Sequence, residues 1–125
     1  MIGDELRART RQFALDGIDL CSALGHTDLA IIIRRQLLRA AMGVASSNRA
    51  AARSRSRREF IAKLSLVIEE SDECELWLDI LETKRIGPAA QVTRLRGEAS
   101  QLCAIFVASR LTVLRKGPKR PQDPA

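Results

Sequence analysis

The charged residues of this chain are sorted into two blocks of opposite sign. From Arg34 to Lys63 every charged residue is basic except Glu59, and from Glu69 to Glu82 every charged residue is acidic. Arginine can bind phosphate or carboxylate groups through paired hydrogen bonds, whereas clustered carboxylates can hold a divalent cation or pair with arginines. Three partners are open for each block: another helix, another copy of the chain or a polyanion. Which of these partners is used decides the function.

The acidic block has two chemical interpretations. A divalent cation would be held by a cluster of four acids: Glu69, Glu70, Asp72 and Glu73. We favour the alternative, in which arginines pair with these acids, because so many like charges on one helix are costly without cations opposite them. The specific hypothesis is that Arg39, Arg49 or Arg53 pairs with Glu70 or Glu73. Changing both glutamates to Gln should then loosen the bundle or its assembly.

The basic block contains more charge than one acidic helix can neutralise. A predicted turn carries four arginines, Arg53, Arg55, Arg57 and Arg58. Serines between them can donate to phosphate oxygens, but no aromatic residue is interleaved to stack on unpaired bases. We therefore expect salt-dependent binding to the backbone of RNA or DNA, with Lys119 and Arg120 of the tail contributing. The simpler alternative is a solvated basic turn that aids solubility.

The residue types needed for common catalytic or metal sites are not assembled by this sequence. The single histidine is His26, and Cys21, Cys74 and Cys103 form no CxxC pair. A zinc site would need all four groups to converge. Neither a Gly-rich phosphate loop nor a nucleophile–histidine–acid set can be recognised. We therefore expect a protein that is not an enzyme and holds no metal or cofactor, with reduced cysteines among apolar residues.

Composition predicts one helical domain. The chain has 125 residues and a formal net charge of +6, and 46% of its residues are hydrophobic but only 3% aromatic. A core of Leu, Ile, Val and Ala suits close-packed helices. No apolar run approaches the roughly 20 residues of a membrane span, and the charged N-terminus lacks the apolar stretch of a signal peptide. We expect a cytoplasmic protein that does not enter a membrane.

Four segments place apolar or small residues at alternating steps of three and four, the spacing of an amphipathic helix. The stripes are Leu6, Thr10, Phe13, Gly17, Leu20 and Leu24; Ile33, Leu37, Ala40, Val44 and Ser47; Phe60, Leu64, Val67, Ser71, Cys74, Trp77 or Leu78, and Leu81; and Val92, Leu95, Ala99, Leu102, Phe106, Ser109 and Val113. Ala14, Ile18 and Cys21 are expected to widen the first stripe. The pattern predicts an all-α, antiparallel up-down-up-down four-helix bundle over residues 1–116.

Capping residues mark the boundaries of these helices. The first helix should run from about Asp4 to Leu24, and Thr27 or Asp28 can cap the second. Ser56 and Glu59 form a capping-box pattern at the start of the third. Gly87-Pro88 should end the third helix and open the fourth, with proline in its first turn. Residues 117–125, rich in proline and basic residues, are expected to be a disordered tail.

Two further features bear on assembly. The small residues of 40–47 predict a close approach to another helix. Several large apolar residues fall partly outside the four stripes, namely Ile31, Leu38, Leu66, Leu76, Ile80, Ile105, Leu111 and Leu114. Apolar surface of this kind is often buried against another subunit, so we expect a homo-oligomer.

The junction of the second and third helices resembles a known family. The residues that carry the resemblance are 47–51 (SNRAA), 53–56 (RSRS), 59–64 (EFIAKL), 69–73 (EESDE) and 77–78 (WL), with 36–41 before them and 98–110 after them. They are similar to the bacterial four-helix bundle protein family, which includes proteins encoded in intervening sequences of the large-subunit ribosomal RNA gene. They are also similar to the accessory variability determinant of diversity-generating retroelements. Near Ala45 and Ala50 the chain departs from the ribosomal branch.

The resemblance implies an up-down bundle, a homopentamer and no enzymatic activity, with nucleic-acid binding as the proposed role. The positions shared with the family include Arg53 and Arg55, which are nucleic-acid-binding candidates. The other shared positions are expected to serve ion pairs or interfaces: Arg39, Asn48, Arg49, Glu59, Lys63, Glu69, Glu70, Asp72, Glu73 and Trp77. The leading hypothesis is a homo-oligomeric bundle that presents basic surface to RNA or DNA. The alternative is a protein-interaction scaffold that binds no nucleic acid and uses its arginines for ion pairs within and between subunits.

Overall fold

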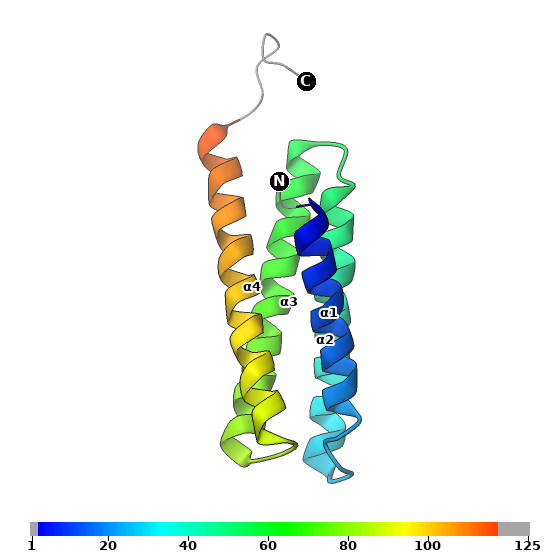
Figure 1. The fold of residues 1–125 in the computed structure, drawn as a ribbon. Helices are drawn as coiled ribbons and strands as arrows, with labels where there is room; N and C mark the ends of the chain where they lie inside the picture. The colour runs from blue at the N-terminus through cyan, green and yellow to red at the C-terminus, as the bar shows by residue number, and fades with distance from the viewer. Residues whose placement is uncertain (1–2, 118–125) are drawn as a thin grey trace.

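The protein is a bundle of four long helices (Figure 1). In the computed structural model, which describes residues 3–117, the helices are α1 (Gly3–Cys21), α2 (Asp28–Ala52), α3 (Arg57–Lys84) and α4 (Ala89–Lys116). No strand occurs in that range. The predicted all-helical class is confirmed. No helix within 3–117 combines the length and apolar character needed to cross a membrane.

Side chains and backbone turns define the helix ends. Thr27 caps α2 by accepting a hydrogen bond from the Ala30 N–H at 3.2 Å. The first helix ends at Cys21, so Leu24 reaches the core from the connection rather than from the helix. At the end of α3, Arg85 takes the left-handed conformation (φ 56°), a position that the sequence had suggested for glycine. Pro88 is the cap preceding α4 and does not lie in its first turn.

The predicted stripes form the core. Every stripe residue of the first two segments is buried. In the third stripe the residues from Leu64 to Leu81 are buried except Trp77, and in the fourth those from Val92 to Phe106 are buried. Phe60, Ser109 and Val113 are only half-buried. These three lie toward the end of the bundle where α3 begins and α4 ends, so the core thins there. Ile18 was expected to widen the first stripe, but it is 41% exposed because it lies at the outer edge of α1.

Helices that follow each other in the chain pack side by side, and α1 also meets α4 across the smallest interface (Figure 1). Small residues allow the closest approaches. A Cβ placed on Gly17 of α1 would lie 3.0 Å from the Ala41 Cβ of α2. On α2, a Cβ at Gly43 would lie 1.9 Å from a carboxylate oxygen of Glu70. The small residues of 40–47 therefore meet both α1 and a side chain of α3, as their composition suggested.

None of the three cysteines forms a disulfide bond within residues 3–117. Cys21 and Cys74 are buried, and Cys103 is half-buried between α3 and α4. Burial raises the pKa of the Cys21 thiol to about 11 and also raises the pKa values of Cys74 and Cys103. At neutral pH all three are thiols, which are poor nucleophiles and poor metal ligands.

Candidate nucleic-acid interface

The basic turn between α2 and α3 is held by its own backbone and by two side chains. The Arg53 N–H donates to the carbonyls of Arg49 and Ala50, both at 3.2 Å, and so ends α2. The Ser56 hydroxyl then accepts from the Glu59 N–H at 3.1 Å and starts α3. The turn is therefore short and fixed, and it presents Arg55 and Arg58 to solvent.

Glu59, the one acid of the basic block, is used by this turn. Its carboxylate accepts the Arg55 N–H at 3.4 Å, one residue before the position expected for a reciprocal capping box. It makes no ion pair among the described residues. The carboxylate therefore contacts the backbone of the turn and no guanidinium group among the described residues.

Arg57 has a different role from the one the sequence suggested. It is half-buried, and its Nη2 donates to the Val113 carbonyl of α4 at 3.3 Å. Its Nε is buried without a hydrogen-bond partner. Arg57 therefore joins the start of α3 to the end of α4, and it offers little of its guanidinium to a ligand. The sequence could not show this contact because the two residues are far apart in the chain.

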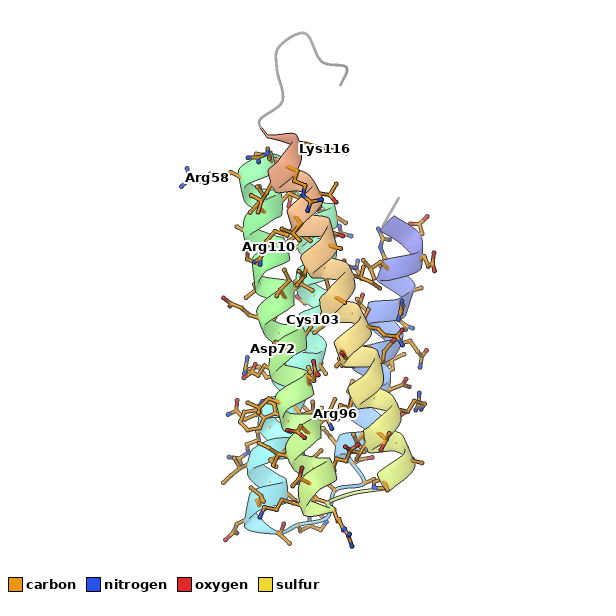
Figure 2. All side chains as sticks on the ribbon, turned by 90° about the vertical axis from the view of Figure 1, so that its left-hand side faces the viewer. Arg58, Asp72, Arg96, Cys103, Arg110 and Lys116 are labelled. Atoms are coloured by element: carbon orange, nitrogen blue, oxygen red, sulfur yellow. The ribbon has the colours of Figure 1, made fainter. Side chains whose placement is uncertain are left out.

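The end of α4 brings further basic residues to the same place. Arg110 is half-buried and donates to the Ser65 hydroxyl at 3.3 Å, whereas Arg115 and Lys116 are exposed. Figure 2 shows Arg58, Arg110 and Lys116 at one end of the bundle, away from Arg96. We call the exposed residues Arg53, Arg55, Arg58, Arg115 and Lys116 the basic end. Arg115 and Lys116 were not predicted as site residues. They could have been found from the sequence, because they form the basic last turn of the fourth helix, and an up-down bundle places that turn beside the Arg-rich turn.

The charges of the basic end are not paired with acids in the part of the chain that the structure describes. None of its five residues forms an ion pair with another residue in 3–117. Arginines elsewhere do pair: Arg96 meets Glu82 at 2.7 Å and Asp79 at 3.4 Å. A hydrogen bond from Thr93, with help from Arg96, lowers the pKa of Glu82. The two predicted tail residues, Lys119 and Arg120, lie outside the described residues.

Only one of the predicted pairs between α2 and α3 forms within the chain. Arg39 meets Glu73 at 2.5 Å. Arg49 and Arg53 are exposed and make no ion pair in the described range, so Arg39 is the one of the three candidate arginines that pairs with Glu70 or Glu73 there. The reason is geometric: Arg49 and Arg53 lie on the outer side of α2, opposite its buried stripe.

Glu70 lies between α2 and α3 without a bonded arginine. Its carboxylate accepts the Ser47 hydroxyl at 2.6 Å and covers Gly43, where no side chain competes for the space. Burial raises the pKa of Glu70, and the hydrogen bond from Ser47 opposes that effect. Glu70 is therefore a partly desolvated carboxylate held by a serine, and it does not belong to an exposed acidic cluster.

The remaining assigned residues are scattered. Asn48 is buried and donates to the Thr10 hydroxyl at 3.3 Å, linking α2 to α1. Trp77 and Lys63 are half-buried, and the Trp77 Nε1 has no hydrogen-bond partner. Glu69 and Asp72 are exposed. Within 3–117 no group of three or more His, Cys, Asp or Glu side chains is placed to hold a metal ion, so the acids do not form the cation site that their composition allowed.

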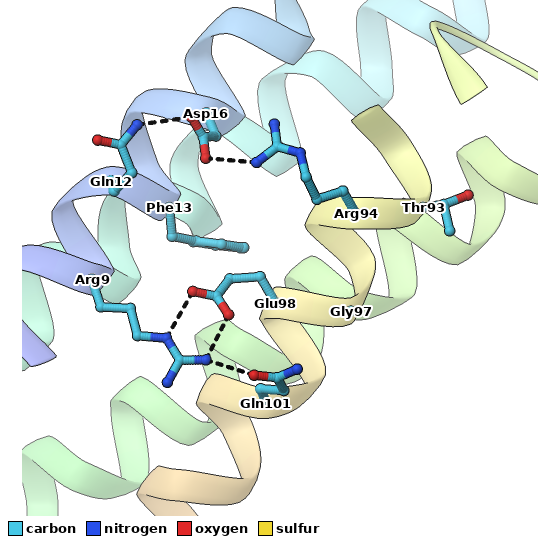
Figure 3. Close-up of a pocket in the computed structure, with 9 residues that line it drawn as sticks. All are labelled: Arg9, Gln12, Phe13, Asp16, Thr93, Arg94, Gly97, Glu98 and Gln101. Atoms are coloured by element: carbon cyan, nitrogen blue, oxygen red, sulfur yellow. Dashed lines mark hydrogen bonds and ion pairs between the residues drawn. The ribbon is translucent and has the colours of Figure 1, made fainter. Parts of the chain in front are cut away.

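A polar groove separates α1 from α4 (Figure 3). Arg9 donates to both carboxylate oxygens of Glu98, at 2.8 and 2.7 Å, and to Gln101 at 2.7 Å. Further along, Arg94 approaches Asp16 at 3.3 Å. The buried ring of Phe13 forms the floor between these two pairs. The charges here neutralise each other, so the groove has less to offer a charged ligand than the basic end.

Comparison with known proteins supports the fold. No protein-family model matches the chain, and no curated protein matches it. The fold is similar to the crystal structure of a protein of unknown function from the S23 ribosomal protein family of Bacteroides thetaiotaomicron, with a TM-score of 0.75 and 23% sequence identity. The match covers 83% of this chain and 96% of that one. At this identity the similarity shows that the two chains share an all-helical four-helix fold.

Proposed function

We propose that this protein is a non-enzymatic, cytoplasmic, homo-oligomeric bundle of up-down-up-down topology that binds the phosphate backbone of RNA or DNA through its basic end. The carrying observation is that exposed cations from the α2–α3 turn and from the end of α4 lie together without an ion-pairing acid among the described residues. The short connections 22–27, 53–56 and 85–88 support the topology, because long helices joined so closely pack antiparallel.

The chemistry of the basic end suits a polyanion. Guanidinium groups bind phosphate through paired hydrogen bonds, and a cluster of them displaces the counterions condensed on a nucleic acid. Binding of this kind follows the charge of the backbone and carries little base specificity. An oligomer would present several basic ends, so its apparent affinity would exceed that of one chain through avidity. The sequence resemblance implies five copies.

Salt-dependent binding tests the proposal. The variant Arg55→Ala/Arg58→Ala/Lys116→Ala removes three exposed cations from the basic end, and Lys84→Ala/Arg85→Ala/Arg94→Ala removes three exposed cations from elsewhere. Binding of mixed-sequence RNA and duplex DNA would be followed by fluorescence anisotropy from low to high salt. The first variant should weaken binding at least about tenfold and reduce the salt slope by about one per lost phosphate contact. The second should lose less than about threefold.

Two outcomes would contradict nucleic-acid binding at this end. Absence of binding at low salt would leave the scaffold alternative, in which the arginines serve contacts between proteins. That alternative has its own observation: Arg39 pairs with Glu73, and Arg57 bonds the Val113 carbonyl. Equal losses in the two variants would show that net charge attracts the polyanion and that the basic end is not a site.

A further inference from the structure

Two seams, exposed except at the half-buried Glu73 and Ile80, run along the outer sides of α2 and α3. On α2 the seam consists of Ile32, Arg35, Arg39, Met42, Ser46, Arg49 and Arg53. On α3 it consists of Ala62, Leu66, Glu69, Glu73, Leu76, Ile80 and Thr83. Both alternate steps of three and four, which is the spacing that lets one helix pack along another. Each helix thus carries a second seam opposite the one buried in its own core.

Both seams expose large apolar side chains. On α2, Ile32 is 57% exposed and Met42 is 48% exposed. On α3, Leu66 and Leu76 are 40% and 50% exposed. The other two helices also expose large apolar residues, Leu15 and Ile18 on α1 and Leu111 and Leu114 on α4. Exposed apolar residues alone therefore do not distinguish α2 and α3; the distinction is that their seams also carry charges of opposite sign.

The charges of the two seams are opposite in sign. The α2 seam carries arginines and no acid, and the α3 seam carries glutamates and no base. Within the described residues only Arg39 and Glu73 pair between them, which leaves Arg35, Arg49 and Glu69 without an ion-pair partner. Asp72, beside the α3 seam, is likewise exposed and unpaired in that range. Each seam therefore repels a copy of itself and attracts the other.

From the spacing, the exposed apolar residues and the segregated charge, we infer that the α2 seam of one copy packs against the α3 seam of the next. This inference rests on the proposed homo-oligomer and names its interface. A two-fold contact would close a dimer, whereas the same pairing of seams repeated head to tail closes into a ring when the rotation between copies allows it, and an odd number of copies such as five requires the head-to-tail form. Neither seam includes Arg55, Arg58, Arg115 or Lys116 of the basic end, so assembly would leave these residues available to a polyanion.

Charge reversal tests which surfaces meet. One variant, Arg35→Glu/Arg49→Glu, makes the α2 seam acidic, and a second, Glu69→Arg/Asp72→Arg, makes the α3 side basic. All four residues are exposed, so both chains should fold. By sedimentation at low salt each variant alone should associate at least about tenfold more weakly than the wild type, because like charges then face each other. One chain that carries all four changes should recover the assembly, because its two seams again have opposite signs.

Apolar substitution gives an independent arm. Leu66→Gln/Leu76→Gln should reduce assembly at least about tenfold, whereas Leu15→Gln/Leu111→Gln, which changes two exposed leucines outside the seams, should leave the mass unchanged. Assembly that survives each of the two single-seam reversals, or a four-change chain that fails to assemble, would overturn the inferred interface while the oligomer itself stands. A wild-type protein that sediments as a monomer would overturn both the oligomer and its interface. Neither result bears on nucleic-acid binding, which is measured separately.

Discussion

The α1–α4 groove and the outer surface of α2 and α3 use charge in different ways. In the groove, acids and bases alternate between the two helices and pair within the chain, as Arg9 does with Glu98 and Arg94 with Asp16. On the outer surface, the α2 seam carries only basic charges and the α3 seam only acidic ones, and most of these charges have no ion-pair partner among residues 3–117. When both helices of an interface carry both signs, their charges pair within the chain. When each seam carries one sign, its charges remain available to pair with another molecule.

The apolar residues show the same difference. The polar pairs of the groove cover Phe13, which is 1% exposed. On the outer surface, Leu76 lies open at 50% exposure among acids. Exposed apolar groups that lie beside charges of one sign can be buried against a complementary surface, which lowers the free energy of assembly. The comparison therefore separates a surface that completes the fold from one suited to assembly.

The largest expected effect comes from removing the buried ring that forms the floor of the α1–α4 groove. Phe13→Ala should lower the free energy of unfolding by about 3–5 kcal/mol, because it removes a buried ring and leaves a cavity between α1 and α4. Leu15→Ala, two residues away and 37% exposed, should cost less than about 1 kcal/mol. Urea unfolding followed by circular dichroism measures both. Similar losses in the two variants would mean that α1 does not pack through Phe13.

A smaller effect is expected from the ion pairs that cover this ring. A double-mutant cycle of Arg9→Ala and Glu98→Ala should give a coupling energy of about 0.5–1 kcal/mol, because the contact is bidentate and the side chains are about one-third exposed. The matching cycle of Arg94 and Asp16 should give a coupling near zero, since Arg94 is 64% exposed. Both couplings should shrink in high salt. A larger coupling for Arg94 would contradict the ranking read from exposure.

Glu70, which lies between α2 and α3, should make the stability of the protein depend on pH. Its pKa is raised by burial, so the folded state binds a proton more readily than the unfolded state does. The contribution of Glu70 to stability is therefore fully present below the ordinary carboxyl pKa and declines as pH rises through the folded pKa. Glu70→Gln removes this decline and can keep a hydrogen bond with Ser47.

We expect Glu70→Gln to be more stable than the wild type at pH 7, by less than about 1 kcal/mol, with the difference vanishing near pH 3. Thermal unfolding at several pH values measures this difference. The expectation reverses the one drawn from the sequence, in which an arginine was paired with Glu70. A variant less stable than the wild type at pH 7 would show that the charge of Glu70 is stabilising after all. Ser47→Ala is the control, because it removes the hydrogen bond and leaves the charge.

The smallest effect is expected on the outer surface. In an assembly-deficient Leu66→Gln/Leu76→Gln chain, adding Arg35→Ala and Arg49→Ala should change the free energy of unfolding by less than about 0.5 kcal/mol. These arginines make no ion pair in the described part of their own chain. Denaturant unfolding at low protein concentration measures the change. A loss above 1 kcal/mol would mean that the two arginines stabilise the monomer, and the contrast with the groove would fail.

Most of the fold was predictable because it depends on local patterns. Alternating steps of three and four placed residues such as Leu37, Val67 and Leu102 in the core, and the structure buries all three. Capping chemistry located the starts of α2 at Thr27 and of α3 at Ser56. Ile18 was misplaced because an apolar residue at the edge of a stripe can face either way, and its neighbour across the interface decides which.

The candidate site was only partly predictable. The exposed Arg53, Arg55 and Arg58 followed from a turn that contains many arginines. The burial of Arg57 against Val113 did not, and neither did the arrival of Arg115 and Lys116, because both depend on where α4 ends relative to α3. Charge counts along the chain also could not distinguish Arg39, which pairs with Glu73, from Arg49, which faces away.

The sequence by itself determined four amphipathic helices, their approximate ends and the sorting of charge into a basic and an acidic block. Those features need only the period of a helix and the chemistry of its caps. The tertiary structure decided which charges meet. Glu59 accepts a backbone hydrogen bond, and Glu70 accepts one from Ser47. Of the three arginines predicted to pair, Arg39 forms an ion pair with an acid of α3. The physical reason is that pairing depends on helix rotation and axial register, which the packing of small residues such as Gly17 and Gly43 sets and which no count of charges along the chain contains.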